Sequence, residues 1–317
     1  MNTELVWLTV SLLYGIPSFV LYVVILFQLV RPKYRKQFNK PFFRLCFLIG
    51  VVDCLAYLMS YIFYTLPTYP LFSSFYGSSI FAPSPFTTFI QFFSYYLIYL
   101  QLFGNFFLTL NRFTAIVFPL KHARIWRLCV PFSIVFTVAV SCAPCWQLAS
   151  TSAFYNTIFA GHPESGYIMS YDHNKYPYHS NSFNQFFASF VTCCSCLLLN
   201  IVSCIFLFLH TSKHPSTASN NRRVEMNFFL IALIIFSIQS VFGIHSMLIY
   251  ISVYTIKNET MSSVLYVLVP WLSDLRYLSP PWVLVIVSTS VRKTIVKTLP
   301  QRLNKVSGTK VEPFATK

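Results

Sequence analysis

Long stretches almost free of charged residues constrain the fold of this chain more than any other feature. A helix needs about 20 mostly apolar residues to cross the hydrocarbon core of a bilayer. Seven such stretches can be counted, so the sequence predicts an all-α membrane protein built as a bundle of seven transmembrane helices. The predicted spans run approximately over residues 5–30, 42–66, 86–111, 128–150, 183–209, 227–254 and 262–289.

Composition agrees with a lipid environment. The chain is 56% hydrophobic and only 10% charged, which leaves too little polar surface to cover a soluble globule of this size. We expect one seven-span domain over residues 1–317, with 290–317 as a cytoplasmic tail. The first apolar run is too long for a signal-peptide core and is expected to remain as the first span. The boundary between spans two and three rests on residues 67–85, where prolines, serines and Gly77 interrupt a helix.

Basic residues are distributed unevenly between the two sides of the predicted bundle. Twenty of the 23 Lys and Arg fall on one side, Lys175 and Lys257 fall on the other, and Arg276 lies within span seven. Since cytoplasmic loops collect Lys and Arg, the N-terminus is predicted to lie outside. The net charge of +15 is then explained by the basic residues that orient the chain in the membrane, and nucleic acid is not an expected partner. Asn258 begins a glycosylation sequon on the predicted outer side.

The residues after span seven have a helical pattern of their own. Val291, Ile295 and Leu299 recur at four-residue spacing, and the remaining face carries Arg292, Lys293 and Lys297. This pattern predicts a short amphipathic helix on the inner leaflet, ended by Pro300.

Neither metal binding nor catalysis is expected. The nine cysteines show no pair of Cys-x-x-Cys motifs and no ligand spacing with histidine. In the second outer loop, His162, His173 and His179 also match no ligand motif, so solvated loop residues are the better interpretation. We find no supported nucleophile and base pair, and we expect no cofactor and no enzyme.

Three short motifs carry a resemblance to a known family. Residues 110–120 read Leu-Asn-Arg-Phe-Thr-Ala-Ile-Val-Phe-Pro-Leu. This segment resembles the Asp-Arg-Tyr segment of rhodopsin-like receptors, with Asn and Phe replacing Asp and Tyr. Extended to His122, it is more similar to nematode serpentine chemoreceptors of class V, within the class gamma superfamily of seven-transmembrane receptors. Residues 14–18 (Tyr-Gly-Ile-Pro-Ser) and 278–282 (Leu-Ser-Pro-Pro-Trp) are similar to the same family.

The resemblance implies a G-protein-coupled chemosensory receptor that binds a small chemical cue and activates a heterotrimeric G protein. The implied location is the plasma membrane of sensory neuron cilia, and the implied partners are the G protein, the small-molecule ligand and the lipid bilayer. A seven-span transporter of a small solute is the alternative. The absence of an internal sequence repeat and the few charges within the spans disfavour that alternative.

By the same resemblance, the coupling site comprises Asn111, Arg112, Phe113 and Pro119 at the inner end of span three. The alternative is that Arg112 is an ordinary anchor at the membrane interface. Asn111 carries no charge, so an inactive-state lock on Arg112 would be a hydrogen bond rather than an ion pair.

Charged residues within the spans point to a polar or switch network. A centred carboxylate costs about 2.5 to 3.5 kcal/mol, so Asp53 must face protein or water, either in a sodium or polar-network site or as a packing residue. Asp274 and Arg276 are two residues apart and do not face each other on a helix, so they need partners on other spans. Pro280 and Pro281 remove two helical hydrogen bonds together, which predicts a kink or hinge.

Aromatic side chains in the outer halves of the spans are the candidates for a ligand pocket, although they could equally pack against lipid. The candidate residues are Tyr95, Tyr99, Phe187, Tyr250 and Tyr266.

The sequence also departs from the rhodopsin-like pattern. No Cys lies between Cys54 and Cys129 or between Cys145 and Cys193, so the disulfide that joins span three to the second outer loop cannot form. That loop must be restrained in another way. Span six lacks Cys-Trp-x-Pro and span seven lacks Asn-Pro-x-x-Tyr, so the detailed rhodopsin-like switch does not transfer.

Overall fold

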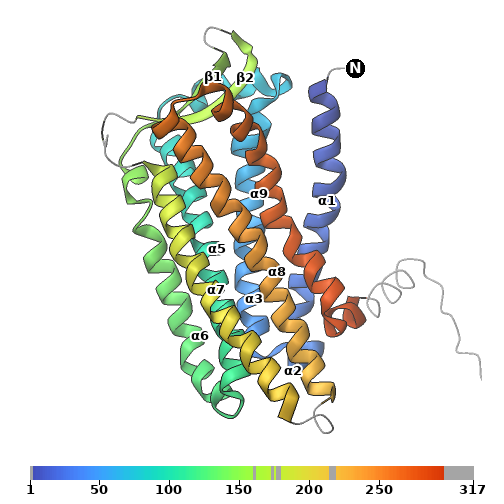
Figure 1. Cartoon of the computed structure of the whole chain (residues 1–317). Helices are drawn as coiled ribbons and strands as arrows, with labels where there is room; N and C mark the ends of the chain where they lie inside the picture. Colours follow the sequence, from blue (N-terminus) through green and yellow to red (C-terminus); the bar gives the residue numbers. More distant parts are fainter. Residues whose placement is uncertain (1–2, 160–161, 173–174, 176–179, 214–218, 296–317) are drawn as a thin grey trace, which may run out of the picture.

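The computed structural model describes residues 3–159, 162–172, 175, 180–213 and 219–295. Within these residues, seven long helices run side by side as a bundle, which is the predicted fold class (Figure 1). The helices are α1 (Thr3–Val30), α3 (Pro41–Ser60), α5 (Pro85–Val117), α6 (Pro119–Cys142), α7 (Asn181–Lys213), α8 (Ser219–Tyr250) and α9 (Glu259–Val287).

The bundle is that of a multi-pass membrane protein. In the described part of the chain, six helices are long and apolar enough to cross a membrane, namely α1, α3, α5, α6, α7 and α8. The seventh long helix, α9, has 29 residues and packs against α1, α3 and α8. It carries Asp274 and Arg276, and charged residues inside a bundle are commonly sites of interhelical pairing.

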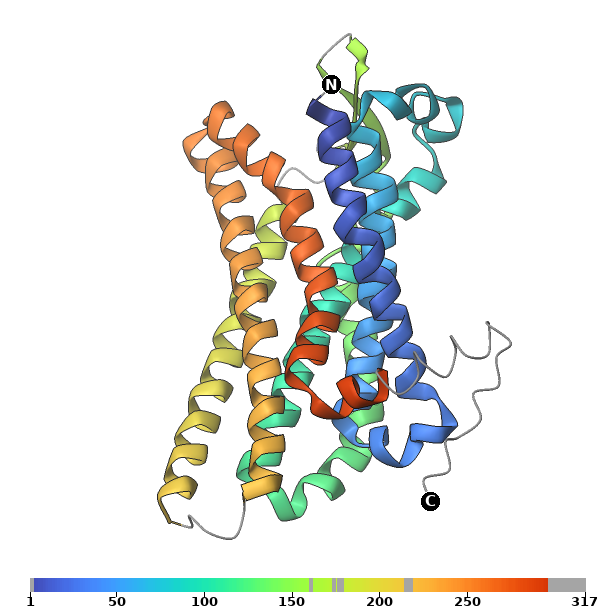
Figure 2. The same ribbon diagram turned by 90° about the vertical axis from the view of Figure 1, so that its right-hand side faces the viewer.

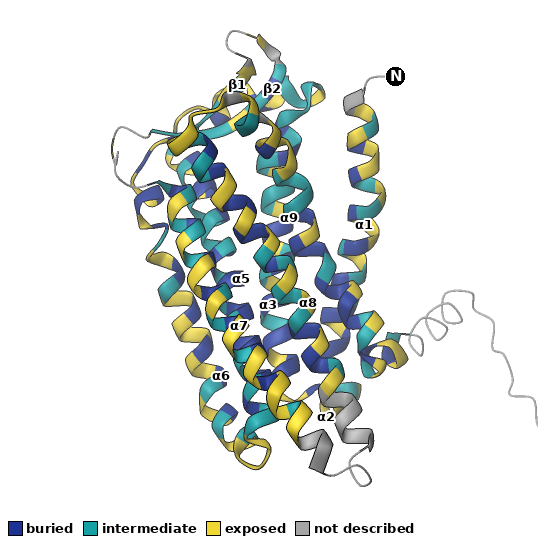
Figure 3. Cartoon of the chain, in the orientation of Figure 1, coloured by how far each residue is buried: buried dark blue, intermediate teal, exposed yellow. Residues whose placement is uncertain are grey.

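Helix α5 forms the centre of the bundle. Of its most apolar segment, 56% is buried, whereas the corresponding share is 22% for α6 and for α7. Helix α5 packs against α3, α6, α7 and α8. Exposed residues follow the outward faces of α6 and α7, and buried residues face the interior (Figure 3). Because lipid is as apolar as a protein core, large exposed side chains such as Leu128 and Leu198 are expected on those outward faces.

Short helical turns replace a continuous helix between α3 and α5. Proline at positions 67, 70, 83 and 85 removes amide donors that a longer helix would need. A π-helical turn, η2 (Tyr61–Thr65), follows α3 directly, and the next turns are η3 (Leu66–Thr68), η4 (Pro70–Phe72), α4 (Ser73–Tyr76) and η5 (Ser79–Phe81). Elsewhere the chain makes turns at η1 (Pro32–Tyr34), α2 (Arg35–Phe38), η6 (Trp146–Ala149) and η8 (Ile251–Ile256).

A β-hairpin covers the end of the bundle at which α1 begins (Figure 1). Strands β1 (Ala153–Phe159) and β2 (His162–Tyr171) pair antiparallel, with Ala153 opposite Tyr171 and an irregularity between Thr157 and Phe159. From the sequence, this segment was expected only as the second outer loop, and its strands were not predicted.

Hydrogen bonds tie this hairpin to the helices. Thr87 Oγ1 on α5 donates to the carbonyl of Ala153 at 2.8 Å, and the hydroxyl of Tyr155 donates to the carbonyl of Phe63 at 2.9 Å. All nine cysteines are free thiols. The hairpin is therefore restrained by hydrogen bonds and packing, with no disulfide to α5.

The chain after α9 folds back against the bundle. Ser288 has an extended backbone that ends α9, and residues 289–295 are helical again (Figure 2). Val291 is buried in the largest hydrophobic cluster, and Ile295 packs against that cluster. The predicted amphipathic helix therefore begins as a docked segment. Three positions of that prediction lie outside the described residues: Lys297, Leu299 and Pro300.

Candidate functional site

Arg112 lies near the end of α5, at the end of the bundle that carries the basic loop between α1 and α3. We call this end the basic end. Arg112 is only 4% exposed, and its guanidinium lies 4.2 Å from the ring centre of Phe42 on α3 and 5.0 Å from that of Phe228 on α8. The same guanidinium donates a hydrogen bond to Asn111 Oδ1. Arg112 is thus enclosed by two neighbouring helices rather than extended to the surface.

The other residues of the predicted coupling segment lie nearer the surface. Phe113 is half-buried and meets Phe118 edge to face, and Pro119 is exposed at the first turn of α6. The junction of α5 and α6 is held by Trp126, whose Nε1 donates to Thr114 Oγ1 at 2.7 Å. The structure therefore separates the segment into a buried pair, Asn111 and Arg112, and an exposed rim.

Asp53 is fully buried in α3 and is bound by a phenol from α1. The hydroxyl of Tyr22 donates to Asp53 Oδ2 at 2.6 Å. Gly50, three residues earlier on α3, makes this approach possible, since a Cβ at that position would lie 2.8 Å from a ring carbon of Tyr22. Asp53 therefore joins α1 to α3 through a buried hydrogen bond.

Asp274 and Arg276 turn toward different helices. The hydroxyl of Tyr14 on α1 donates to Asp274 Oδ2. Arg276 Nη2 donates to the carbonyl of Ile98 on α5 at 2.9 Å, and the guanidinium lies 4.4 Å from the ring centre of Phe242 on α8. The two charges do not pair with each other, and together they connect α9 to three other helices.

The proline pair of α9 is accommodated by a side chain from α5. Pro280 has no amide hydrogen for the carbonyl of Arg276, four residues back. The amide Nε2 of Gln101 approaches that carbonyl at 3.5 Å, and α9 remains helical as far as Val287. Neighbouring helices commonly satisfy the backbone groups that proline leaves free in a membrane helix.

Two of the three sequence motifs meet in space. Trp282 Nε1 on α9 donates to Ser18 Oγ on α1 at 3.0 Å, and the bond from Tyr14 to Asp274 lies on the same pair of helices. Residues 14–18 and 278–282 therefore form one α1–α9 contact.

The predicted aromatic residues lie in different surroundings. Tyr99 is fully buried at the hairpin end, in a cluster against which Tyr95 also packs. Phe187 stacks on Phe183, which in turn contacts Tyr250. Both Phe187 and Tyr266 are more than half exposed. The structure brings Tyr95 and Tyr99 together in the interior and leaves Phe187 and Tyr266 at the surface.

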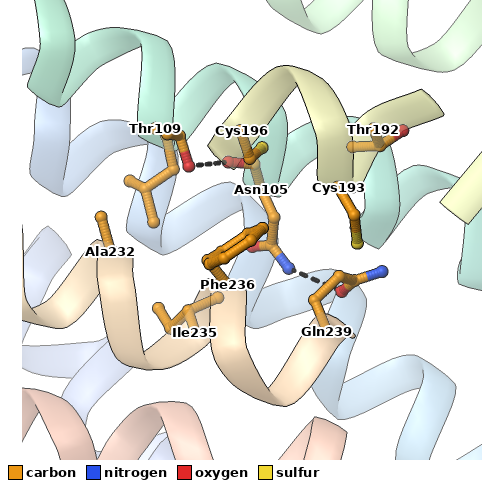
Figure 4. A pocket seen from close by; sticks show the side chains of 10 residues that line it. Asn105, Thr109, Thr192, Cys193, Cys196, Ala232, Ile235, Phe236 and Gln239 are labelled. Atoms are coloured by element: carbon orange, nitrogen blue, oxygen red, sulfur yellow. Dashed lines mark hydrogen bonds between the residues drawn. The ribbon is translucent and has the colours of Figure 1, made fainter. Parts of the chain in front are cut away.

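Two cavities differ greatly in size. A cleft of about 480 Å³ opens at the hairpin end, beside the start of α5 and the residues that precede β1. The residues that line it include Thr88, Ser150, Phe89 and Phe92. Ligand sites commonly span about 300 to 1,000 Å³. The second cavity, about 10 Å³, lies among α5, α7 and α8 (Figure 4).

Other predicted positions can also be placed. Asn258 is exposed and caps α9, because its Oδ1 accepts a hydrogen bond from the amide of Met261 at 3.0 Å. His162 is exposed on β2, and His173 and His179 lie outside the described residues. In the described part of the chain, no group of three His, Cys, Asp or Glu side chains could hold a metal ion.

Several residues of this network were not predicted from the sequence. The partners of Arg112, Phe42 and Phe228, carry no signal in the sequence because they are two among 34 phenylalanines. The buried amides could have been found, since polar side chains within an apolar span commonly face the bundle interior. These are Gln101, Asn105 and Gln239.

Comparison with known proteins decides the family. The family model described as Srg family chemoreceptor matches residues 8–295, nearly the whole chain. The chain belongs to the Srg chemoreceptor family. The match includes the α1–α9 contact, the Asn111–Arg112 pair and the docked turn after α9.

Two relatives of this Srg-family chain come from Caenorhabditis elegans. The chain is 34% identical to serpentine receptor class V-1 over 111 residues, which are 35% of this chain and 33% of that protein. It is 22% identical to serpentine receptor class gamma-10 over 233 residues, which are 73% of this chain and 66% of that protein. The chain thus spans less than two thirds of the length of either relative in these matches.

Proposed function

We propose that this Srg-family chain is a G-protein-coupled chemoreceptor with its hairpin end outside the cell and its basic end in the cytoplasm. A small chemical cue binds near the hairpin end, and a heterotrimeric G protein binds at the basic end. The excess of Lys and Arg at the basic end supports this orientation, because such residues are retained on the cytoplasmic side. The proposed location is the plasma membrane of sensory cilia.

The enclosure of Arg112 between α3 and α8 is the observation that carries the proposal. In the resting receptor, the rings of Phe42 and Phe228 lie on the guanidinium and close the basic end. If α8 moves outward, Phe228 moves away and Arg112 becomes available to the incoming G protein. Agonist and G protein must both favour that open conformation, so each raises the affinity for the other.

The strength of the ring contacts suits a switch. A cation lying over an aromatic ring is stabilised by about 0.5 to 2 kcal/mol, depending on how far it is desolvated. Displacing one such ring therefore costs little free energy. A ligand supplies that free energy by binding the open state more tightly than the closed state. The bond from Arg112 to Asn111 also holds the guanidinium in its enclosed position, so it adds to the restraint of the closed state.

The interior aromatic cluster at the hairpin end is the proposed ligand-binding region. Tyr95 and Tyr99 belong to it, and Phe92 both packs against it and lines the 480 Å³ cleft. Hydroxyl groups and phenyl rings together fit a small, weakly polar molecule better than a charged one. Among the predicted aromatic residues, Tyr95 and Tyr99 are therefore stronger candidates than Phe187 and Tyr266.

The decisive test compares signalling with transport. The full chain is reconstituted in lipid nanodiscs with a promiscuous G protein and screened against volatile and water-soluble compounds, with nucleotide exchange as the readout. We expect at least one compound to accelerate exchange, and the same compound to show no net flux in sealed proteoliposomes. Solute flux without any effect on exchange would instead establish the transporter alternative.

Orientation has a separate test. An epitope tag at the N-terminus should be accessible on intact cells, and accessibility only after permeabilisation would overturn the assignment. Asn258 provides supporting evidence only, because Lys257 alone separates it from η8 and glycan transfer requires clearance from the bilayer.

A further inference from the structure

A polar row runs along one side of α5 between the two buried arginines. Its members are Gln101, Asn105, Thr109 and Arg112, spaced at four, four and three residues, which places them on one face of a helix. All four are buried, and the first contacts the backbone of Arg276. Asn105 lies seven residues before Arg112, or about 10 Å along the helix axis.

Asn105 connects this row to α8 through a side-chain hydrogen bond. Its Nδ2 donates to Gln239 Oε1 at 3.3 Å, and the two side chains meet from facing helices (Figure 4). Asn105 is 8% exposed and Gln239 is 4% exposed. The bond therefore joins the central helix to α8 well inside the bundle.

This amide pair leaves two strong polar atoms without partners. Asn105 Oδ1, an acceptor, and Gln239 Nε2, a donor, are both fully buried and make no hydrogen bond. A buried polar atom without a partner costs about 1 to 3 kcal/mol, so native structures almost always provide one. Asn105 Oδ1 needs a hydrogen-bond donor, and Gln239 Nε2 needs an acceptor. One molecule that both donates and accepts hydrogen bonds can satisfy both atoms.

The small cavity lies against the same amide pair. Its volume is about 10 Å³, and its walls include Asn105, Thr109, Thr192, Cys196 and Gln239. A single water needs about 10 to 15 Å³ measured in this way, together with two to four polar groups. The amides and the threonine hydroxyls meet that requirement, whereas the cavity is too small for an organic ligand.

We propose that this cavity is a binding site for one internal water molecule, which completes the polar joint between α5, α7 and α8. The water takes up hydrogen-bonding capacity of Asn105 and Gln239 that the direct bond leaves unused. The joint lies between the Arg276 contact and the Arg112 enclosure, on the two helices whose separation releases Arg112. Its existence does not depend on the coupling role of Arg112.

Radiolytic labelling tests the site in the intact receptor. A water activated by an X-ray pulse produces hydroxyl radicals that oxidise the nearest side chain. Cys196 lines the cavity and is 4% exposed, whereas Cys46 is 7% exposed in a hydrophobic cluster and Cys145 is fully buried. We expect Cys196 to be oxidised severalfold faster than both control thiols, although it is no more exposed than Cys46. Equal or slower oxidation of Cys196 would overturn the proposal.

A double substitution provides the second arm. Asn105→Leu with Gln239→Leu removes both amides at similar volume, and the rate at Cys196 should then fall to that of Cys145 in the same sample. An unchanged rate at Cys196 would mean that bulk solvent reaches it, which contradicts the site. If the double variant does not fold, the comparison of the three thiols in the unsubstituted receptor still decides the question.

Discussion

The two buried arginines, Arg112 and Arg276, are held in different ways. Both are less than 5% exposed, and both lie over a phenylalanine of α8. Arg276 also donates a hydrogen bond to the backbone carbonyl of Ile98 on α5, at 2.9 Å. Arg112 donates a hydrogen bond to Asn111 within its own helix, and its guanidinium lies against rings of both α3 and α8.

This difference indicates different roles for the two side chains. A directed hydrogen bond to another helix fixes the positions of both helices, whereas a ring over a cation tolerates sliding and can be withdrawn. We propose that Arg276, through its bond to Ile98, holds α9 against α5 in every state of the receptor. Arg112 is suited to be covered in one state and uncovered in another.

The largest expected effect is on folding, from Arg276→Ala. Removing a buried charge together with its hydrogen bond leaves a void beside Phe242, and such changes cost about 3 to 5 kcal/mol. We expect little receptor at the cell surface and a much lower unfolding temperature after purification. Arg112→Ala is the matched control and should lower the unfolding temperature far less. Equal losses for the two variants would remove the distinction between them.

The second effect is on basal signalling, from Phe228→Leu. Loss of one ring from Arg112 should favour the open state by about 0.5 to 2 kcal/mol, which corresponds to roughly a 2-fold to 30-fold rise in basal nucleotide exchange. Phe229→Leu is the control, because Phe229 is adjacent and equally buried. Trifluorinated phenylalanine at position 228 keeps the ring but removes its negative face, so it should behave like Leu. If basal exchange by the trifluorinated variant equals that of the wild type, the packing of the ring restrains Arg112, and the cation–ring attraction does not.

The location of the helices could be predicted from sequence, but most side-chain partners could not. Apolar runs reveal the spans because a helix needs about 20 mostly apolar residues to cross the hydrocarbon core. Arg112 could likewise be singled out by its charge, and Pro280 by its missing amide hydrogen. Phe42 and Phe228, however, lie far from Arg112 in the chain, and only the packing of three helices selects them. The hairpin was missed because its strands are stabilised by contacts with α5 and the turns before it.

The third effect comes from Asn111→Asp and has the opposite sign. A carboxylate at this position would accept a charge-assisted hydrogen bond from Arg112, about twice as strong as the neutral one. Basal exchange should therefore fall, by roughly fivefold for a gain of about 1 kcal/mol. Asn111→Leu, which is uncharged and cannot accept a hydrogen bond, should not lower basal exchange. A rise in exchange for the Asp variant would contradict the proposed restraint.

The smallest expected effect is on maximal signalling, from replacing Pro280 and Pro281 with Ala. The new amide of residue 280 would bond to the carbonyl of Arg276 and make the contact from Gln101 unnecessary. A stiffer α9 should roughly halve the maximal response while surface expression changes less. Pro270→Ala in the same helix is the control. An unchanged maximal response at matched expression would reject a hinge at this position.

The central claim is that Arg112 meets the G protein when α8 moves away. The most direct test measures nucleotide exchange by Arg112→Ala receptor in nanodiscs, with the agonist found by the screen and at equal amounts of folded receptor. The account predicts that stimulated exchange is abolished and that the G protein no longer raises agonist affinity, while agonist binding itself remains. Full agonist-stimulated exchange by this variant would contradict the account and leave Arg112 as a packing residue between α3 and α8.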